Sequence, residues 1–391
     1  MKKSSEDGSF VPMLLNDPTD QISEEYFANN GLARREFFSL LIGGLGTTAL
    51  VGNQSIGPSS TTETNMEDVQ FGISPVIDLA VAGASAGKTF NEFQAFIEGS
   101  LNAGIHVLCV PMAEIDNFEA TARNIITLYG RIAQIQGKAL IIRKPSDIKK
   151  SILEKKVGII PTFRGMEMIV EKLDLLGAFR AVGIGVISLT TPWKNWNGDG
   201  CYERSDLGLT GLGRMAVQTL EKERIVLDLS GVGRRSSLEA MDLTNVPVLF
   251  SRSNSTMVRE HPWNLTDTQI DACAKTDGVI CLTALPHLVS ESTGSLNDFV
   301  KHIDYVAARV GVRHVGIGLE LNTKPLQRFS TDPSSNDPSS YLKGLDKLSH
   351  VVDLRVVLQR RGYESIEIDG ILGGNVHRVF QMVWRVENEF E

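Results

Sequence analysis

The sequence predicts an α/β protein whose single large domain is a TIM (β/α)8 barrel, preceded by an N-terminal export and linker segment. From residue 71 onward, short apolar runs alternate with stretches of helical periodicity. This alternation is typical of a parallel sheet that helices cover on both faces. Eight such apolar runs can be counted, which is the strand number of this barrel. The chain of 391 residues is long enough for one barrel of about 250 residues or more and an additional tail.

The first 70 residues divide into three predicted segments. Residues 1–33 form a polar leader, residues 34–52 a signal segment, and residues 53–70 a linker rich in Ser, Thr and Asn. The signal segment begins with Arg34 and Arg35 and continues into an apolar run, a pattern that resembles a twin-arginine export signal. This run is shorter than the roughly 20 residues that span a bilayer. We expect export of a folded domain by the twin-arginine machinery, to a periplasmic or membrane-associated location; the alternative is an amphipathic helix docked on the barrel.

The barrel is expected over residues 71–391. Its eight strands are predicted at residues 75–82, 104–111, 157–163, 182–190, 224–230, 246–251, 278–284 and 312–320, with a short extra strand at 139–143. Polar stretches at 193–206 and 322–340 follow the fourth and eighth strands. They are therefore expected at the C-terminal face, where barrel enzymes build their sites.

Caps and periodicity predict the helices between the strands. Thr266 or Asp267 can cap a helix over residues 268–276, and residues 297–310 carry apolar side chains at helical spacing. A closing helix is expected to start at Asn375, which serves as its N-cap after a Gly-Gly turn.

The composition argues against two classes of function. The net charge is -8 and no cluster of Lys and Arg occurs, whereas binding to nucleic acid requires concentrated positive charge. The four cysteines lack the Cys-x-x-Cys spacing of a structural zinc site.

Five phrases in the second half of the chain carry a resemblance to a known family. They are IVLDLSGVG (225–233), PVLFSRSNS (247–255), HPWNLTD (261–267), HVGIGLELN (314–322) and ILGGNVHRVF (371–380). Together they resemble the membrane dipeptidase (renal dipeptidase) family, whose members are two-metal zinc peptidases on a TIM barrel. The resemblance implies metal-binding His, Asp and Glu residues at the ends of the strands.

Most positions that the resemblance assigns to this chemistry hold other residues here. The family's first-strand His-x-Asp pair, its metal-bridging Glu, and its His residues after the fourth, fifth and sixth strands correspond to Ala80, Ala82, Arg164, Thr191, Gly231 and Arg252. The Arg that grips the substrate carboxylate in the family corresponds to Trp263, and the Asp that closes the eighth strand corresponds to Glu320. A guanidinium is always protonated and cannot coordinate zinc, so we expect the family's metal site to be lost and no cofactor to be bound.

Two arginines at former ligand positions suggest a replacement for the metals. Buried carboxylates without a counter-ion are costly, so Arg164 and Arg252 are expected to pair with Glu320 and Asp78 across the barrel mouth. Alternatively, both arginines point into solvent, where ion pairs are common and weak.

The residues therefore predict a pseudoenzyme that binds a small anionic ligand or acts in regulation, with Asp78, Arg164, Arg252, Trp263 and Glu320 as its candidate binding residues. One alternative is a metal-free enzyme with Glu320 as its base. The other is an active metallo-dipeptidase that binds zinc and hydrolyses dipeptides. A homodimer is possible, because family members often pair.

Overall fold

The computed structural model describes residues 74–81, 89–113, 117–135, 137–169, 172–291, 294–321 and 342–385. The leader, signal and linker predicted before residue 71 lie outside these ranges. Within the described residues, no helix combines the length and apolar character needed to cross a membrane.

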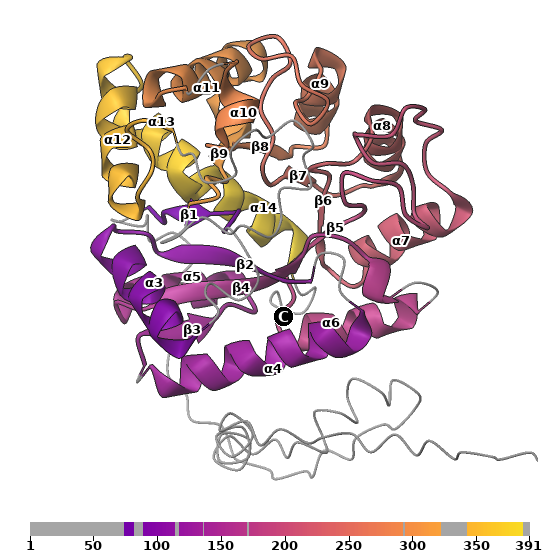
Figure 1. Cartoon of the computed structure of the whole chain (residues 1–391), viewed down its shortest axis with the longest axis horizontal. Coiled ribbons are helices and arrows are strands. Elements are labelled where there is room, and N and C mark those ends of the chain that lie inside the picture. Colours follow the sequence, from indigo (N-terminus) through magenta and orange to yellow (C-terminus); the bar gives the residue numbers. More distant parts are fainter. Residues whose placement is uncertain are drawn as a thin grey trace, which may run out of the picture.

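Parallel strands form a nearly closed barrel, as predicted (Figure 1). The barrel strands, in their spatial order, are β1 (Ile77–Asp78), β2 (Val107–Ala113), β4 (Val157–Phe163), β5 (Val186–Ser188), β6 (Val226–Asp228), β7 (Leu249–Phe250), β8 (Val279–Leu282) and β9 (Val315–Ile317). The predicted extra strand is also present, as β3 (Ala139–Ile141), which pairs with the N-terminal part of β4. The predicted strands lie at the correct positions but are mostly too long, and residues 312–314 form a 3-10 turn before β9.

Two backbone hydrogen bonds join the first barrel strand to the last. The N–H of Leu79 donates to the carbonyl of Ile317 at 3.2 Å, and the N–H of Glu320 donates to the carbonyl of Ala80 at 2.8 Å. These bonds lie at the ends of β1 and β9 and close the ring of strands. We call this junction the seam.

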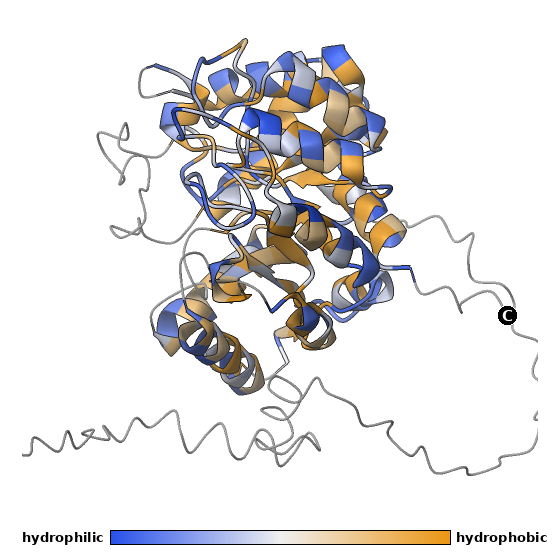
Figure 2. Ribbon diagram, turned by 90° about the vertical axis from the view of Figure 1, so that its right-hand side faces the viewer, coloured by the Kyte–Doolittle hydropathy of each residue, from blue (hydrophilic) through white to orange (hydrophobic). Residues whose placement is uncertain are grey.

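Helices surround the strands and supply the outer layer of the barrel. They are α3 (Phe90–Asn102), α4 (Phe118–Gln134), α5 (Pro145–Leu153), α6 (Leu176–Ala181), α7 (Gly211–Lys222), α8 (Arg234–Leu243), α9 (Asp267–Lys275), α10 (Pro286–Val289), α11 (Leu296–Val310), α12 (Val351–Arg360), α13 (Ser365–Asp369) and α14 (Asn375–Val383). Apolar residues gather on the strands and on the helix sides that face them (Figure 2). Thr266 is the N-cap of α9 and forms a capping box with Gln269, in agreement with one of the two caps predicted for this helix.

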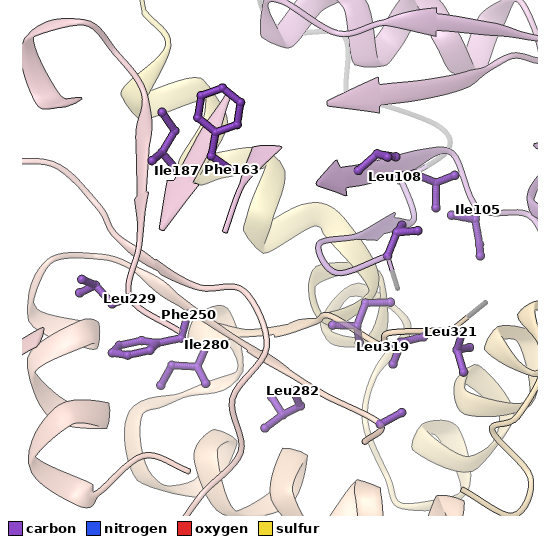
Figure 3. Close-up of a cluster of buried hydrophobic side chains, with 14 of the residues drawn as sticks. Ile105, Leu108, Phe163, Ile187, Leu229, Phe250, Ile280, Leu282, Leu319 and Leu321 are labelled. Atoms are coloured by element: carbon purple, nitrogen blue, oxygen red, sulfur yellow. The ribbon is translucent and has the colours of Figure 1, made fainter. Parts of the chain in front are cut away.

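Successive side chains of a strand point alternately to its two faces, and this divides the core into two layers. In β2, Leu108 and Val110 belong to the outer core between strands and helices, whereas Val107 and Cys109 belong to the inner core of the barrel. Figure 3 shows part of the outer core, including Phe163 and Phe250. Because successive side chains of a strand point to opposite faces, a strand buried on both faces is apolar at nearly every position.

The last helix, α14, packs against the inner core at the N-terminal end of the strands. Its residues Val376, Val379 and Phe380 join the inner core, and Trp384 donates from Nε1 to the carbonyl of Gly185, just before β5. The prediction that Asn375 caps this helix is wrong. The preceding turn (Gly370–Gly374) is kinked at Gly373, whose backbone is non-helical, and Asn375 instead donates from Nδ2 to the carbonyls of Val312 and Val315. The N-terminal end of the barrel is thereby covered, and the C-terminal end is left for a site.

Candidate functional site

Glu320 lies at the C-terminal end of the barrel, three residues after the end of β9 and on the seam. Its backbone has a φ of 57°, a left-handed conformation that is uncommon and costly for a residue with a side chain. The hydrogen bond from its N–H to Ala80 holds it there. Non-glycine residues in this conformation often occur at functional sites, and here the Glu320 side chain is directed to two arginines.

Arg164 is the first of these arginines and follows β4 directly. Its backbone N–H donates to the carbonyl of Ala113 at 2.8 Å, which continues the pairing of β4 with β2. Its Nη2 donates to the carbonyl of Val81 at 2.8 Å and lies 2.8 Å from Oε1 of Glu320. Both side chains of this ion pair are about nine-tenths buried, at 10% and 9% exposure, so water screens the interaction weakly.

Arg252 is the second arginine and follows β7. Its Nε lies 3.4 Å from the same Oε1 of Glu320, and its side chain is 5% exposed. The guanidinium also stacks on the indole of Trp263, with Cζ 5.2 Å from the ring centroid. Trp263 donates in turn from Nε1 to the carbonyl of Arg252 at 2.8 Å. The structure therefore brings Arg164, Arg252, Trp263 and Glu320 together at the barrel mouth.

Asp78 lies beside this group but has different partners from those expected. Its Oδ1 accepts hydrogen bonds from the N–H groups of Ala80 and Leu319, at 3.1 and 2.8 Å. Its Oδ2 is buried and has no hydrogen-bond partner. The carboxyl group thus accepts hydrogen bonds from the backbone of the seam. The expected ion pair of Asp78 with Arg164 or Arg252 is not formed among the described contacts.

Burial raises the pKa of Asp78 to about 7, because an ionised carboxylate is poorly solvated there. The backbone hydrogen bonds from Leu319 and Ala80 oppose this shift, the charge of Glu320 adds to it, and the charge of Arg164 opposes it. Near neutral pH, Asp78 therefore holds a proton for part of the time.

Several positions to which the resemblance assigns family site residues hold small residues here. Neighbouring groups pack against these small residues. Ala80 is buried, and Thr191 contacts the carbonyl of Trp193 through its hydroxyl at 3.4 Å. Gly231 has a φ of +79°, and a Cβ placed there would lie 3.3 Å from the indole of Trp263. The ring of Trp263 thus covers the space next to position 231. Ala82 lies outside the described residues.

Asp228, which sequence reasoning did not select, has a defined role beneath the arginines. Its Oδ1 accepts from the N–H groups of Ser230 and Ser251, and its Oδ2 from the hydroxyls of Ser188 and Ser251. Ser230 then accepts from the N–H of Arg252 at 2.9 Å. This network fixes the backbone from which the Arg252 side chain extends. The Asp-Leu-Ser phrase that contains Asp228 was the available signal in the sequence.

An aromatic cluster forms the rim next to Trp263. Tyr202 contacts Trp193, Trp263 and His261 edge to face, with centroid distances of 5.4, 6.0 and 6.0 Å. His261 contacts His287 at 5.6 Å. Trp193 is 42% exposed, so the cluster reaches from the solvent to the stacked guanidinium of Arg252.

The charges of the site determine what it can bind. Two guanidinium groups surround one carboxylate, and the neighbouring Asp78 is only partly ionised. No group of three or more His, Cys, Asp or Glu side chains that could hold a metal ion is present in the described part of the chain. A net positive, largely desolvated pair of arginines is suited to carboxylate or phosphate oxygens.

Comparison with known proteins relates this barrel to peptidases. The family model for membrane dipeptidase (peptidase family M19) matches residues 91–391. Dipeptidase tcpJ of Claviceps purpurea is 23% identical over 263 residues, which cover 66% of this chain and 59% of the relative. An uncharacterized dipeptidase of Schizosaccharomyces pombe is 27% identical over 239 residues, which cover 60% of this chain and 55% of the relative. The chain thus spans less than two thirds of the length of these two relatives.

Solved structures with the same fold include an amidohydrolase from Pseudomonas aeruginosa, with a TM-score of 0.72 and 24% identity over 80% of this chain and 97% of that chain. The probable dipeptidase PvdM from Pseudomonas aeruginosa has a TM-score of 0.70 and 16% identity, and the match covers 80% and 96% of the two chains. At these identities the likeness concerns the fold, and it confirms the barrel prediction.

Proposed function

The chain belongs to the membrane dipeptidase family, and from this premise we propose that its barrel mouth binds a small carboxylate or phosphate ligand without two-zinc hydrolysis. One observation carries the proposal: the guanidinium groups of Arg164 and Arg252 converge on Oε1 of Glu320, at 2.8 and 3.4 Å. Both arginines stand where the family resemblance places metal ligands. Positive charge that two metal ions would supply in a peptidase is supplied here by side chains.

The arrangement of Arg252 and Trp263 also favours recognition of an anion. The resemblance assigns a carboxylate-gripping Arg to position 263, whereas this chain has the cation at position 252 and an aromatic ring at 263. The ring stacks on the guanidinium, and stacking of this kind orients the planar donors of an arginine. The site thereby keeps a cation that can bind a ligand carboxylate, but at position 252 instead of position 263.

Zinc content and anion binding test the proposal together. We expect the purified protein, equilibrated with zinc and freed of excess metal, to hold far less than two equivalents of zinc and to leave dipeptides intact. Inorganic phosphate or acetate should bind in calorimetry, and Arg164→Met or Arg252→Met should weaken this binding at least tenfold. Hydrogen bonds to charged groups contribute about 1.5–3 kcal/mol, which sets this scale.

Arg123→Met provides the matched control, because Arg123 forms an ion pair on the exposed surface of α4, with 74% of its side chain accessible. This variant should bind anions like the wild type. Two bound zinc ions together with dipeptide hydrolysis would overturn the proposal and identify an active metallo-dipeptidase.

Metal-free acid–base catalysis is a second candidate, favoured by one observation. Burial raises the pKa of Asp78 to about 7, and a group that titrates near the working pH is suited to proton transfer. Glu320 lies close enough to influence this titration. Turnover of a substrate that persists with a chelator and disappears in Glu320→Gln would support this candidate over simple binding.

We also propose that residues 1–70 direct export of the folded barrel through the twin-arginine machinery, since Arg34 and Arg35 precede an apolar run. Fusion of these residues to a reporter that is active only after export in a folded state tests this. Replacement of both arginines by lysine should abolish export, while replacement of Lys2 and Lys3 by arginine should not. Export of the double-lysine variant at the wild-type level would contradict the proposal.

A further inference from the structure

We infer that Glu320 is a built-in competitor for the anion site, which a ligand must displace from Arg164 and Arg252 in order to bind. The inference rests on the anion-binding role proposed above and concerns how that site is regulated. Oε1 of Glu320 is 2.8 Å from Nη2 of Arg164 and 3.4 Å from Nε of Arg252. A ligand oxygen that contacts both guanidinium groups would occupy the same place.

The backbone of Glu320 explains why its carboxylate points to the arginines. With a φ of 57° and a hydrogen bond from its N–H to Ala80, the residue is held in a conformation that side chains disfavour. The surrounding structure therefore holds Glu320 in this orientation although its backbone conformation is unfavourable for a residue with a side chain. Movement of the carboxylate requires only side-chain rotation, since the backbone bond to Ala80 does not involve it.

Both arginines are anchored by contacts that do not depend on Glu320. Arg164 donates from Nη2 to the carbonyl of Val81 at 2.8 Å. Arg252 stacks on Trp263, and its backbone is held by the hydroxyl of Ser230. The guanidinium groups thus stay in position when the carboxylate leaves, and the binding geometry is formed in advance.

An external anion can make contacts that Glu320 does not. Arg164 contacts both Val81 and Glu320 through Nη2, whereas a guanidinium has five N–H donors in a planar fork. Both ion pairs are made through Oε1 of Glu320. A ligand carboxylate or phosphate with several free oxygens can engage each fork in a bidentate manner.

The full-length protein and its Glu320→Gln variant test the inference by calorimetric titration with inorganic phosphate, and separately with acetate. Glutamine keeps the shape of the side chain and removes its charge. We expect the variant to bind at least one of these probes tenfold or more tightly than the wild type. A larger gain with phosphate than with acetate would identify phosphate as the preferred chemistry, and the reverse would identify a carboxylate.

Glu239→Gln is the matched control, because Glu239 also bridges two arginines, Arg214 and Arg235, at 2.9 and 2.8 Å. It lies on α8, outside the proposed site, and its substitution should leave anion affinity at the wild-type level. If Glu320→Gln lowers thermal stability, phosphate should raise its melting temperature by more than that of the wild type. Glu320→Asp, which keeps the charge on a shorter side chain, should bind anions more weakly than Glu320→Gln.

The outcomes separate this inference from the proposed function. Equal affinity of wild type and Glu320→Gln, with loss of binding in Arg164→Met, overturns the inference and leaves the anion site intact. Absence of binding in both proteins overturns the inference and the proposed function together. Tighter binding by Glu320→Gln that persists after addition of Arg164→Met and Arg252→Met places the anion elsewhere and also overturns the inference.

Discussion

Relative to the residues that the family resemblance assigns to these positions, Arg252 and Trp263 change the chemistry of the barrel mouth most directly. A guanidinium at 252 cannot coordinate a metal, and the indole at 263 covers both this group and the space above Gly231. Cation–π contacts contribute about 2 kcal/mol when they are desolvated, and both side chains are at least nine-tenths buried. The two residues therefore stabilise each other at the barrel mouth.

Asp78→Asn should change the dependence of stability on pH. Burial raises the pKa of Asp78 from 3.8 to about 7, so between these pH values the folded protein holds a proton that the unfolded chain has lost. The contribution of Asp78 to stability is thus complete below about pH 4 and is lost as the pH rises through 7, by an amount of order 4 kcal/mol. Urea unfolding of wild type and variant between pH 5 and 8 measures this difference.

His302 produces an opposing effect in nearly the same pH window, which makes the comparison with the variant necessary. Burial lowers the pKa of His302 to about 4, so stability is lost as the pH falls from about 6.5 to 4. Asp78→Asn should therefore expose a rise of stability with pH that the wild type partly conceals. Asp353→Asn, at an exposed position on α12, should retain the wild-type profile. A parallel profile for Asp78→Asn and the wild type would exclude a raised pKa.

The sequence identifies part of the site because strand ends can be located from apolar runs. Arg164, Arg252 and Glu320 each follow such a run, so their convergence at one face follows from the barrel. The partners of Asp78 could not be predicted, since they depend on the register in which β1 meets β9, 241 residues away. The role of Asp228 was missed for a similar reason: its four donors come from three different strand ends.

At the scale of single elements, the strands are shorter than their apolar runs. β1 and β7 have two residues each, whereas six to eight were predicted, because residues beyond the paired segment stay buried after the ladder ends. Burial, and not pairing, determines apolar composition. The closing helix shows the same limit in part, since the predicted Gly-Gly turn is present as a kink at Gly373, whereas Asn375 after it does not cap the helix.

Gly373→Ala should test how this turn packs on β1. A Cβ at residue 373 would lie 2.2 Å from the carbonyl oxygen of Pro75 and 2.8 Å from the backbone nitrogen of Ile77. Backbone atoms cannot move aside as a flexible side chain can, so we expect a loss of about 1–3 kcal/mol in the free energy of unfolding. Chemical denaturation measures it. Gly130→Ala, in α4 with no atom near the added methyl group, should leave stability unchanged or slightly increased.

At the scale of the whole molecule, the barrel architecture and the family were predicted, whereas the function of the barrel mouth stays a proposal. Eight buried parallel strands with helices between them admit few other architectures, and the phrases near the strand ends indicate the family. They do not indicate which ligand the barrel mouth binds in our proposal, because a barrel scaffold supports many chemistries. Since α14 packs across the N-terminal end of the strands, the mouth that carries Arg252 and Trp263 is the end of the barrel at which we propose the ligand binds.

The seam has a consequence for how the protein is made. Asp78 belongs to the first barrel strand and Glu320 follows the last one, so the site does not exist in any shorter chain that ends before residue 320. During synthesis, residues near Asp78 leave the ribosome long before their partners, at rates of roughly 5–20 residues per second. For more than ten seconds the nascent barrel thus has two open edges, and the mouth is completed only when the chain near residue 320 pairs with the first strand.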